Sequence, residues 1–264
     1  MNISYESFCK FLYSYCENDW KNLSLQSQKT EKLNDLTRNV CLYGSSNQEF
    51  LEIHDILPNH CTEFTPIYIL NFQDEMAEGG LDDYLIHHLV TNNVRVFFAK
   101  HSYYQNKELD REFQREGLPF WKKNIASQLI GIQYLKEQGA LFNVNGIGMN
   151  GLGSCLLAAL YYHGISCNTI HIINGLIDFN QIANNGIWNC VFNDGFYYGL
   201  DSQSVKNTPE LQFLNPSMLF LRLQAQQKIY YTLDNFEPVE PDKNMIIKTY
   251  QNQKQLLYQL LESV

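Results

Sequence analysis

The sequence lacks the features that mark nucleic-acid-binding, exported and membrane proteins. Lysine and arginine number 19 against 28 aspartates and glutamates, the net charge is −9, and the longest basic cluster is Lys122-Lys123. The sequence has no cluster of positive charge that could bind a phosphate backbone, so we expect no nucleic-acid partner. No apolar run reaches the length of a membrane span, about 18 to 20 residues. The N-terminus also lacks a basic segment followed by an apolar one, so we expect a soluble protein without a standard export signal.

Cysteine and histidine show no spacing typical of a metal site. The seven cysteines form no CxxC pair, and their odd number leaves at least one thiol unpaired. This usage favours a reducing, cytoplasmic setting. His87 and His88 are adjacent on a predicted helix and therefore face different directions. We expect neither a metal nor a cofactor.

Apolar residues make up 45% of the 264 residues and aromatic residues 14%, which is ample for a packed core. We find no internal repeat and no linker, and we expect residues 1–264 to form a single α/β domain. Residues 1–35 are predicted to be an N-terminal helical extension. Residues 175–215 are predicted to be a loop-rich excursion over the sheet.

Hydrophobic periodicity and turn residues predict the order of the elements. A helix at 4–17 and a polar loop at 18–32 lead to an antiparallel hairpin at 38–57. Two βαβ units follow, separated by a helix at 121–138. The first unit has strands at 66–71 and 94–99 around a helix at 80–91, and the second has strands at 140–145 and 168–174 around a helix at 151–163. Strands at 218–223 and 228–233 and a helix at 243–262 complete the chain.

The stretch from 140 to 164, ALFNVNGIGMNGLGSCLLAALYYHG, is the centre of this arrangement. An apolar strand enters a glycine-rich segment, and a helix rich in leucine and alanine leaves it. Glycine permits a positive φ and a close approach of neighbouring backbone, so we expect a tight turn here. Sites in open α/β sheets lie at the carboxyl ends of strands, which makes this corner the expected functional position.

This order of elements resembles the α/β-hydrolase fold, with residues 38–180 similar to its first six strands. Acetyl-xylan-esterase-like and dienelactone-hydrolase-like members have a similar helix before the nucleophile elbow. The resemblance implies a mostly parallel central sheet with helices on both faces and an N-terminal antiparallel hairpin. It also implies that strand 66–71 lies between strands 94–99 and 140–145. The glycine-rich turn stands where the family has its elbow.

The catalytic residues of that family are not matched. The elbow pattern G-x-S-x-G aligns with Gly148-Met149-Asn150-Gly151-Leu152, which puts Asn150 at the position of the nucleophilic serine. Asparagine tolerates a positive φ, but its amide is not a nucleophile. The family's histidine follows the last strand, whereas the last histidine here is His171. We therefore expect a catalytically degenerate member, a pseudoenzyme that works by binding a ligand or a protein partner.

The corner is still expected to bind a small ligand. In the hydrolase fold, the oxyanion hole uses the backbone N–H after the elbow residue and another N–H from the loop after the third strand. These positions correspond to Gly151 and to the loop that contains Gln73 and Asp74. With the Asn150 side-chain amide added and with Gln73 and His101 at the rim, we predict a small polar pocket for a carbonyl or carboxylate group. The alternative is a corner filled by side chains.

Two other interpretations stay open. The first is an ester hydrolase or acyl transferase with a non-standard site built from His101, Asn150 and either Ser154 or Cys155, although packing in the core suits Cys155 better. The second is a dinucleotide-binding enzyme, because residues 146–151 also spell G-x-G-x-x-G. That motif is expected to have an acidic residue about 20 positions further on, and the sequence has none there. His163 and His171 are predicted to be structural.

Overall fold

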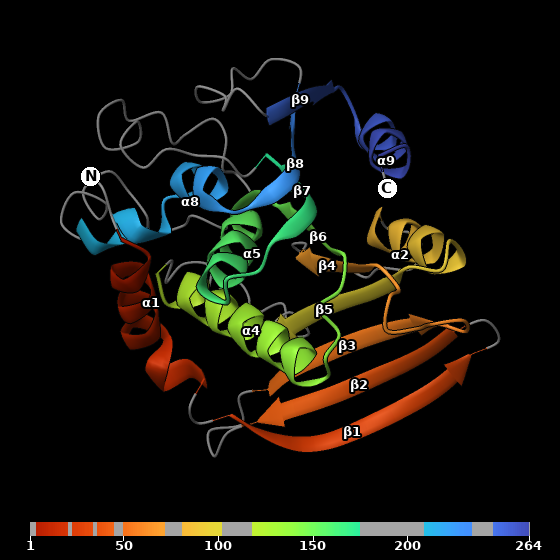
Figure 1. The fold of residues 1–264 in the computed structure, drawn as a ribbon, viewed down its shortest axis with the longest axis horizontal. Helices are drawn as coiled ribbons and strands as arrows, with labels where there is room; N and C mark the ends of the chain where they lie inside the picture. The colour runs from red at the N-terminus through yellow and green to blue at the C-terminus, as the bar shows by residue number, and fades with distance from the viewer. Residues whose placement is uncertain are drawn as a thin grey trace.

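The computed structural model describes residues 4–20, 23–33, 36–44, 50–71, 81–101, 118–174, 209–233 and 245–263. These residues form a nine-stranded sheet in the order β1-β2-β3-β5-β4-β6-β7-β8-β9 (Figure 1). The pairs β1–β2, β2–β3 and β3–β5 are antiparallel, and the pairs from β5–β4 through to β8–β9 are parallel. The strands are β1 (Ser24–Leu33), β2 (Leu36–Gly44), β3 (Phe50–Pro58), β4 (Ile67–Asn71), β5 (Arg95–His101), β6 (Val144–Met149), β7 (Cys167–Ile173), β8 (Ala225–Leu233) and β9 (Met245–Tyr250).

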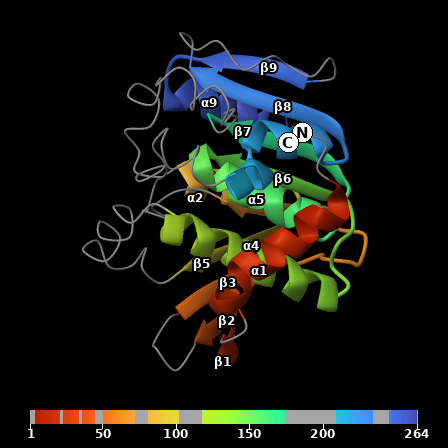
Figure 2. The same cartoon turned by 90° about the vertical axis from the view of Figure 1, so that its left-hand side faces the viewer.

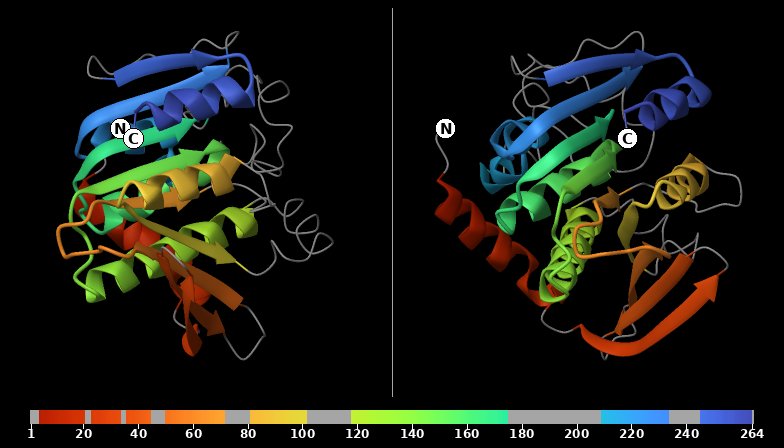
Figure 3. Two further views of the ribbon diagram at one scale, coloured as in Figure 1. Left: turned by 90° about the vertical axis from the view of Figure 1, so that its right-hand side faces the viewer. Right: turned by 45° about the vertical axis from the view of Figure 1, so that its right-hand side comes forward.

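Helices pack on both faces of the sheet, as predicted (Figure 3). One face carries the helices α1 (Tyr5–Trp20), α4 (Leu118–Glu137), α5 (Asn150–Tyr162) and α8 (Pro216–Arg222), with a 3-10 helix at Pro209–Leu214. The other face carries α2 (Leu81–Thr91) and α9 (Gln253–Leu261). Figure 2 shows α1 on the outside of the first layer, where it contacts α4 and α5. Among the described helices, none has both the length and the apolar character that crossing a membrane requires.

The parallel centre of the sheet confirms the predicted strand order. β4 lies between β5 and β6, with Ile69 opposite Phe97 on one side and Gly146 on the other. Every residue of β4 is buried because both of its faces are covered by helices. Such a strand is expected to be continuously apolar, as IYIL is.

The N-terminal hairpin forms as predicted, but it is not at the edge of the sheet. β1 pairs with β2 from Ser24–Gly44 to Leu33–Leu36, although most of it was expected to belong to the polar loop at 18–32 of the helical extension at 1–35. The expectation was wrong because the segment SLQSQKTEKL has almost no apolar residues. All of its side chains from Ser24 to Thr30 are exposed, so only the backbone pairing with β2 makes it a strand.

Two predictions near the C-terminus were also wrong. Residues 218–223 were expected to be a strand, but residues 218–222 belong to helix α8 and Leu223 caps its end. Pro216 occupies the start of α8, and the side chain of Asn215 accepts a hydrogen bond from Ser217 N at 3.2 Å. The predicted helix at 243–262 is instead strand β9 followed by helix α9. Asn252 caps α9 by accepting from Gln255 N at 3.0 Å.

Candidate functional site

The corner after β6 is a direct change from strand to helix. β6 ends at Met149 and α5 begins at Asn150, with no loop residue between them. The strand was predicted at 140–145, and the observed strand begins four residues later, at Val144. Gly146 and Gly148 are therefore strand residues, and neither has the positive φ expected of a turn.

These two glycines are required because α5 and β7 pack close to β6. A Cβ added at Gly148 would lie 2.5 Å from Gly153 Cα in the first turn of α5. A Cβ at Gly146 would lie 2.5 Å from Ile170 Cδ1 on β7. The expectation of close approach was correct, and the expectation of a glycine turn was wrong. The geometry also disfavours the dinucleotide interpretation, since a phosphate-binding loop would have to follow the strand, whereas Gly146 and Gly148 lie within it.

Several strands end at the carboxyl edge of the sheet beside this corner, and their last residues lie there. Asn71, the last residue of β4, pairs in register with Gly148 on β6. Leu70 pairs with Phe98 on β5, so His101 at the end of β5 extends beyond Asn71 along the same edge. The backbone of the sheet thus brings the ends of β5, β4 and β6 together, as predicted.

The predicted polar pocket at this corner is only partly covered by the structure. Gln73 and Asp74 belong to residues 72–80, which lie outside the described residues. The side chains of His101 and Asn150 are likewise outside the described part. Gly151 lies in the first turn of α5, where helix N–H groups have no partner within the helix. The pocket therefore stays a prediction.

The two proposed alternative nucleophiles are in the protein core. Ser154 is 1% exposed and Cys155 is 0% exposed, both within α5. Cys155 packs in the apolar cluster of that face of the sheet, which confirms the expectation of core packing. A side chain enclosed in this way does not meet a substrate at the corner.

Two asparagines at the ends of strands were missed by the sequence analysis. Asn71 ends β4 and is 5% exposed. Asn174 follows β7 with a φ of 51°, and its backbone N–H donates to Tyr231 O at 2.9 Å. The Asn174 side chain donates to the hydroxyl of Tyr250 at the end of β9. The available signal was the repeated pattern of a buried strand ending in asparagine, YILN and HIIN.

His171 is buried beneath the sheet face covered by α2 and α9, as predicted. It is 0% exposed, and its Nδ1 lies 3.2 Å from the Tyr231 hydroxyl. Ser263 Oγ donates to Gln259 O at 2.7 Å and so accepts from Tyr231 at 2.8 Å, which leaves Nδ1–H of His171 as the donor to Tyr231. Burial lowers the pKa of His171 to about 3, so the ring is neutral.

His163 and His54 are also held by structural contacts. His163 Nε2 donates to Leu129 O at 3.0 Å, and burial lowers the His163 pKa. The His163 ring is therefore held by a backbone contact, in agreement with the structural role predicted for it. His54 accepts from Arg38 Nη2 at 2.9 Å and donates to Glu52 Oε2 at 3.1 Å. Within the described residues, no group of three histidine, cysteine or acidic side chains could hold a metal ion.

Comparison with known proteins identifies the architecture. No protein-family model and no curated protein matches the sequence. Among solved structures, the acetyl xylan esterase from Paenibacillus sp. R4 matches with a TM-score of 0.62 and 8% identity over 97% of this chain and 94% of that one. Acetyl xylan esterase 1 from Thermoanaerobacterium sp. JW/SL YS485 matches with a TM-score of 0.57 and 10% identity over 98% and 93% of the two chains. The chain has the α/β-hydrolase fold.

Other esterases share this fold with the chain. The glucuronoyl esterase from Solibacter usitatus matches with a TM-score of 0.53 and 11% identity over 97% of this chain and 91% of that one. In the α/β-hydrolase fold, the nucleophile elbow lies at a turn from a strand into a helix. The predicted fold class is therefore confirmed, and Asn150 is the first residue of the helix that follows β6.

Proposed function

We propose that this chain is a catalytically degenerate α/β-hydrolase-fold protein that binds a small carbonyl- or carboxylate-bearing ligand at the corner after β6. The observation that carries the proposal is Asn150 at the first position of α5, where an esterase of this fold needs serine. An amide has no ionisable proton to give a general base and does not attack a carbonyl carbon. The protein would thus retain the binding corner of the fold without catalysing ester hydrolysis.

The end of the chain supports the loss of a general base. The fold's histidine follows the last strand, and here the residues between β9 and α9 are Gln251 and Asn252. Asn252 caps α9, and Gln251 N donates to Gln255 Oε1 at 2.8 Å. Both residues therefore have defined roles in starting the last helix. With no histidine after His171, the standard triad has no candidate for its base.

The hydrolase alternative is less well supported. It requires Ser154 or Cys155 to act as a displaced nucleophile, and both are buried in α5. His171 and His163 are neutral rings bonded to structural partners, so neither is available as a base at the corner. Of the residues predicted for the non-standard site, His101 is then the candidate base.

Binding at the corner is supported by the start of α5. This helix has 13 residues, and its first N–H groups, including that of Gly151, carry partial positive charge toward the carboxyl edge. Backbone donors do not depend on the identity of the elbow side chain. Asn150 adds an amide that donates and accepts hydrogen bonds. A carbonyl or carboxylate oxygen suits this combination of donors.

The test is a ligand-induced thermal shift with acetate, acetamide and benzoate as probes, since a ligand that binds the native state raises the unfolding temperature. We expect a concentration-dependent rise with at least one carboxylate in the unmodified protein. Asn150→Asp keeps the shape and adds a negative charge, so it should abolish the carboxylate effect. Gln251→Glu adds the same charge at the end of β9 as a control for general repulsion. Equal shifts in all three proteins would contradict a site at Asn150.

The setting of the protein is part of the same proposal. Six cysteines of the described residues have free thiols, which supports a reducing, cytoplasmic location. The nine-stranded sheet joins segments from Ser24 to Tyr250, which supports a single α/β domain. A protein partner that offers a carboxylate or carbonyl group is the other possible occupant of the corner.

A further inference from the structure

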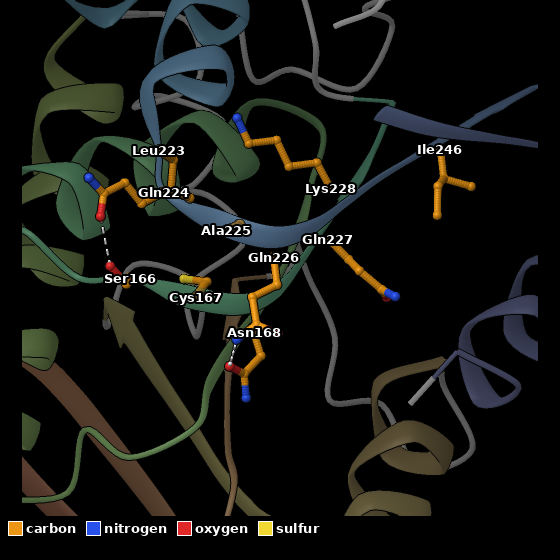
Figure 4. A pocket seen from close by; sticks show the side chains of 10 residues that line it. All are labelled: Ser166, Cys167, Asn168, Leu223, Gln224, Ala225, Gln226, Gln227, Lys228 and Ile246. Carbon is orange, nitrogen blue, oxygen red and sulfur yellow. Dashed lines mark hydrogen bonds between the residues drawn. The ribbon is translucent and has the colours of Figure 1, made fainter. Parts of the chain in front are cut away.

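The opposite edge of the sheet holds a cavity of about 660 Å³ at the amino ends of β7, β8 and β9 (Figure 4). Because β6, β7 and β8 are parallel, this cavity and the corner after β6 lie at opposite ends of the strands. Five of the described lining residues carry a hydroxyl or amide side chain: Ser166, Asn168, Gln224, Gln226 and Gln227. The cavity plays no part in the function proposed above.

Two sets of hydrogen bonds order these side chains into what we call the amide array, which consists of Asn143, Ser166, Asn168, Gln224 and Gln226. Ser166 Oγ donates to Gln224 Oε1 at 3.0 Å. Gln226 Nε2 donates to Asn168 Oδ1 at 3.3 Å, and Asn168 Nδ2 donates to Asn143 Oδ1 at 3.2 Å. Each amide has two N–H donors and two acceptor positions, so these bonds orient the groups without saturating them.

The amide array is anchored to the sheet. Asn143 has a φ of 45°, and its carbonyl accepts from the side chain of Asn145 at 2.9 Å and from Ile67 N at 3.3 Å. Asn145 is itself 6% exposed, and its Oδ1 accepts from Thr169 N at 3.2 Å. The exposed amides therefore start from a fixed backbone, and less conformational entropy would be lost on binding a ligand.

The described lining of the cavity carries little charge. Lys228 is the one charged residue of the described lining, and it is 7% exposed. Its ammonium group donates to Leu221 O at 2.9 Å and lies 5.6 Å from the centre of the Phe220 ring. Figure 4 shows its side chain extending toward α8, away from Gln226 and Asn168. The lysine thus faces the protein, and the ligand-facing groups are neutral amides.

An exposed aromatic pair adjoins the amide array. Phe142 is 40% exposed and precedes Asn143, and Phe64 is 62% exposed. The two rings pack edge to face with their centres 5.2 Å apart. Large exposed aromatic rings are costly in water unless something covers them. Because Phe142 is the chain neighbour of Asn143, the pair gives an apolar platform next to the Asn143 end of the amide array.

We propose that the amide array and the Phe64–Phe142 pair form a binding site for a neutral oligosaccharide. Each sugar hydroxyl both donates and accepts, which matches the remaining donors and acceptors of the amides. The C–H face of a sugar ring can pack on an aromatic ring. An anionic ligand would find the ammonium of Lys228 already engaged, and a cationic one would find no carboxylate in the described lining. A purely apolar ligand would desolvate the amides without replacing their hydrogen bonds.

The experiment is an NMR titration of the full chain that follows the Asn and Gln side-chain N–H₂ signals. Xylohexaose, cellohexaose and maltohexaose are the neutral probes, and a galacturonic acid hexamer is the charged comparison. We expect at least one neutral hexamer to shift the signals of Asn168 and Gln226. Gln226→Ala and Phe142→Ala should each weaken that binding by at least about fivefold.

Two controls match the size and exposure of these changes. Gln133→Ala removes an exposed amide on α4, and Tyr258→Ala removes an exposed ring on α9. Neither should change the affinity, and unfolding temperatures of all variants check that the fold is retained. The proposal is overturned if no neutral hexamer shifts these signals at about 10 mM, if the charged hexamer binds more tightly, or if the control variants weaken binding equally. Changes at Asn150 leave this binding unaffected, so the two proposals fail independently.

Discussion

The corner between β6 and α5 and the outer ribbon of β1 and β2 are opposite extremes of the same sheet. Nearly all of β6 is buried, and its glycines let a helix pack against the strand backbone. The side chains of β1 from Ser24 to Thr30 are all exposed, and β1 is held by pairing with β2. Substitutions in the parallel centre should therefore lower the free energy of unfolding more than substitutions in the ribbon. The following predictions test that contrast, from the largest expected effect to the smallest.

The ion pair between Asp55 and Arg95 joins the hairpin to the parallel centre. Asp55 is 2% exposed and accepts two hydrogen bonds from Arg95, at 2.7 and 2.6 Å. The Arg95 side chain is 14% exposed, so Asp55→Ala leaves a largely buried guanidinium without its carboxylate, which should lower the free energy of unfolding by about 3 kcal/mol. Denaturant unfolding measures this loss. The double variant Asp55→Leu/Arg95→Met removes both charges and should recover most of it. If the double variant is as unstable as Asp55→Ala, the cost is one of packing and not of an unpaired charge.

Gly148→Ala tests the close packing at the corner. The new Cβ would meet backbone, Gly153 Cα at 2.5 Å, and backbone cannot rotate away. We expect a loss of about 3 kcal/mol in the free energy of unfolding. Gly153→Ala is the matched control, because its Cβ would have 3.3 Å to Ile172 Cδ1 and alanine favours the helix. Equal losses for the two variants would show that the strand backbone does not set the limit.

Acidification should weaken the protein through its buried histidines. Burial lowers the pKa of His171 from its ordinary value of 6.5 to about 3, and burial also lowers the pKa values of His54 and His163. The unfolded chain therefore binds protons first, and stability falls as pH decreases below 6.5 toward 3. Each such histidine contributes a slope of up to about 1.4 kcal/mol per pH unit. His171→Leu should make the slope shallower in urea unfolding between pH 7 and pH 5. An unchanged slope would contradict a neutral, buried His171.

Thr30→Ala on β1 should have the smallest effect. The Thr30 hydroxyl donates to Asn39 Oδ1 at 2.8 Å on the exposed ribbon. Because both groups find water when the bond is lost, the free energy of unfolding should change by no more than about 0.5 kcal/mol. Denaturant unfolding beside Gly148→Ala measures the contrast directly. A loss as large as that of Gly148→Ala would show that the ribbon belongs to the stability core.

The sequence predicted the parallel centre because that part of the fold follows local pattern. The strand at 66–71, the helix at 80–91 and the strand at 94–99 each have a clear period and a clear turn, and all three formed. Strand β1 has no apolar alternation, so its pairing with β2 could not be seen locally. In 218–223, a short apolar run fits a strand or a helix, and the cap formed by Asn215 and Pro216 was the deciding signal.

The candidate site was predicted less completely than the fold. The sequence located the corner and identified Asn150 at the elbow, because the motif and the strand-helix order are local. It placed the glycines in a turn, although Gly148 is needed for a contact with Gly153 that only the folded chain reveals. It also missed Asn174, which bonds to Tyr250 across β8, because that contact joins residues 76 positions apart.

The central claim, that the corner binds without catalysing hydrolysis, is tested most directly by turnover of p-nitrophenyl acetate. The unmodified protein should hydrolyse the ester no faster than buffer, and a fluorophosphonate probe should not label it. Asn150→Ser alone should also be inactive, because no histidine follows β9 to activate the serine. Asn150→Ser/Gln251→His supplies both groups and shows whether the corner still orients them. Turnover by the unmodified protein that is lost in Ser154→Ala or Cys155→Ala would contradict the account and establish a non-standard hydrolase.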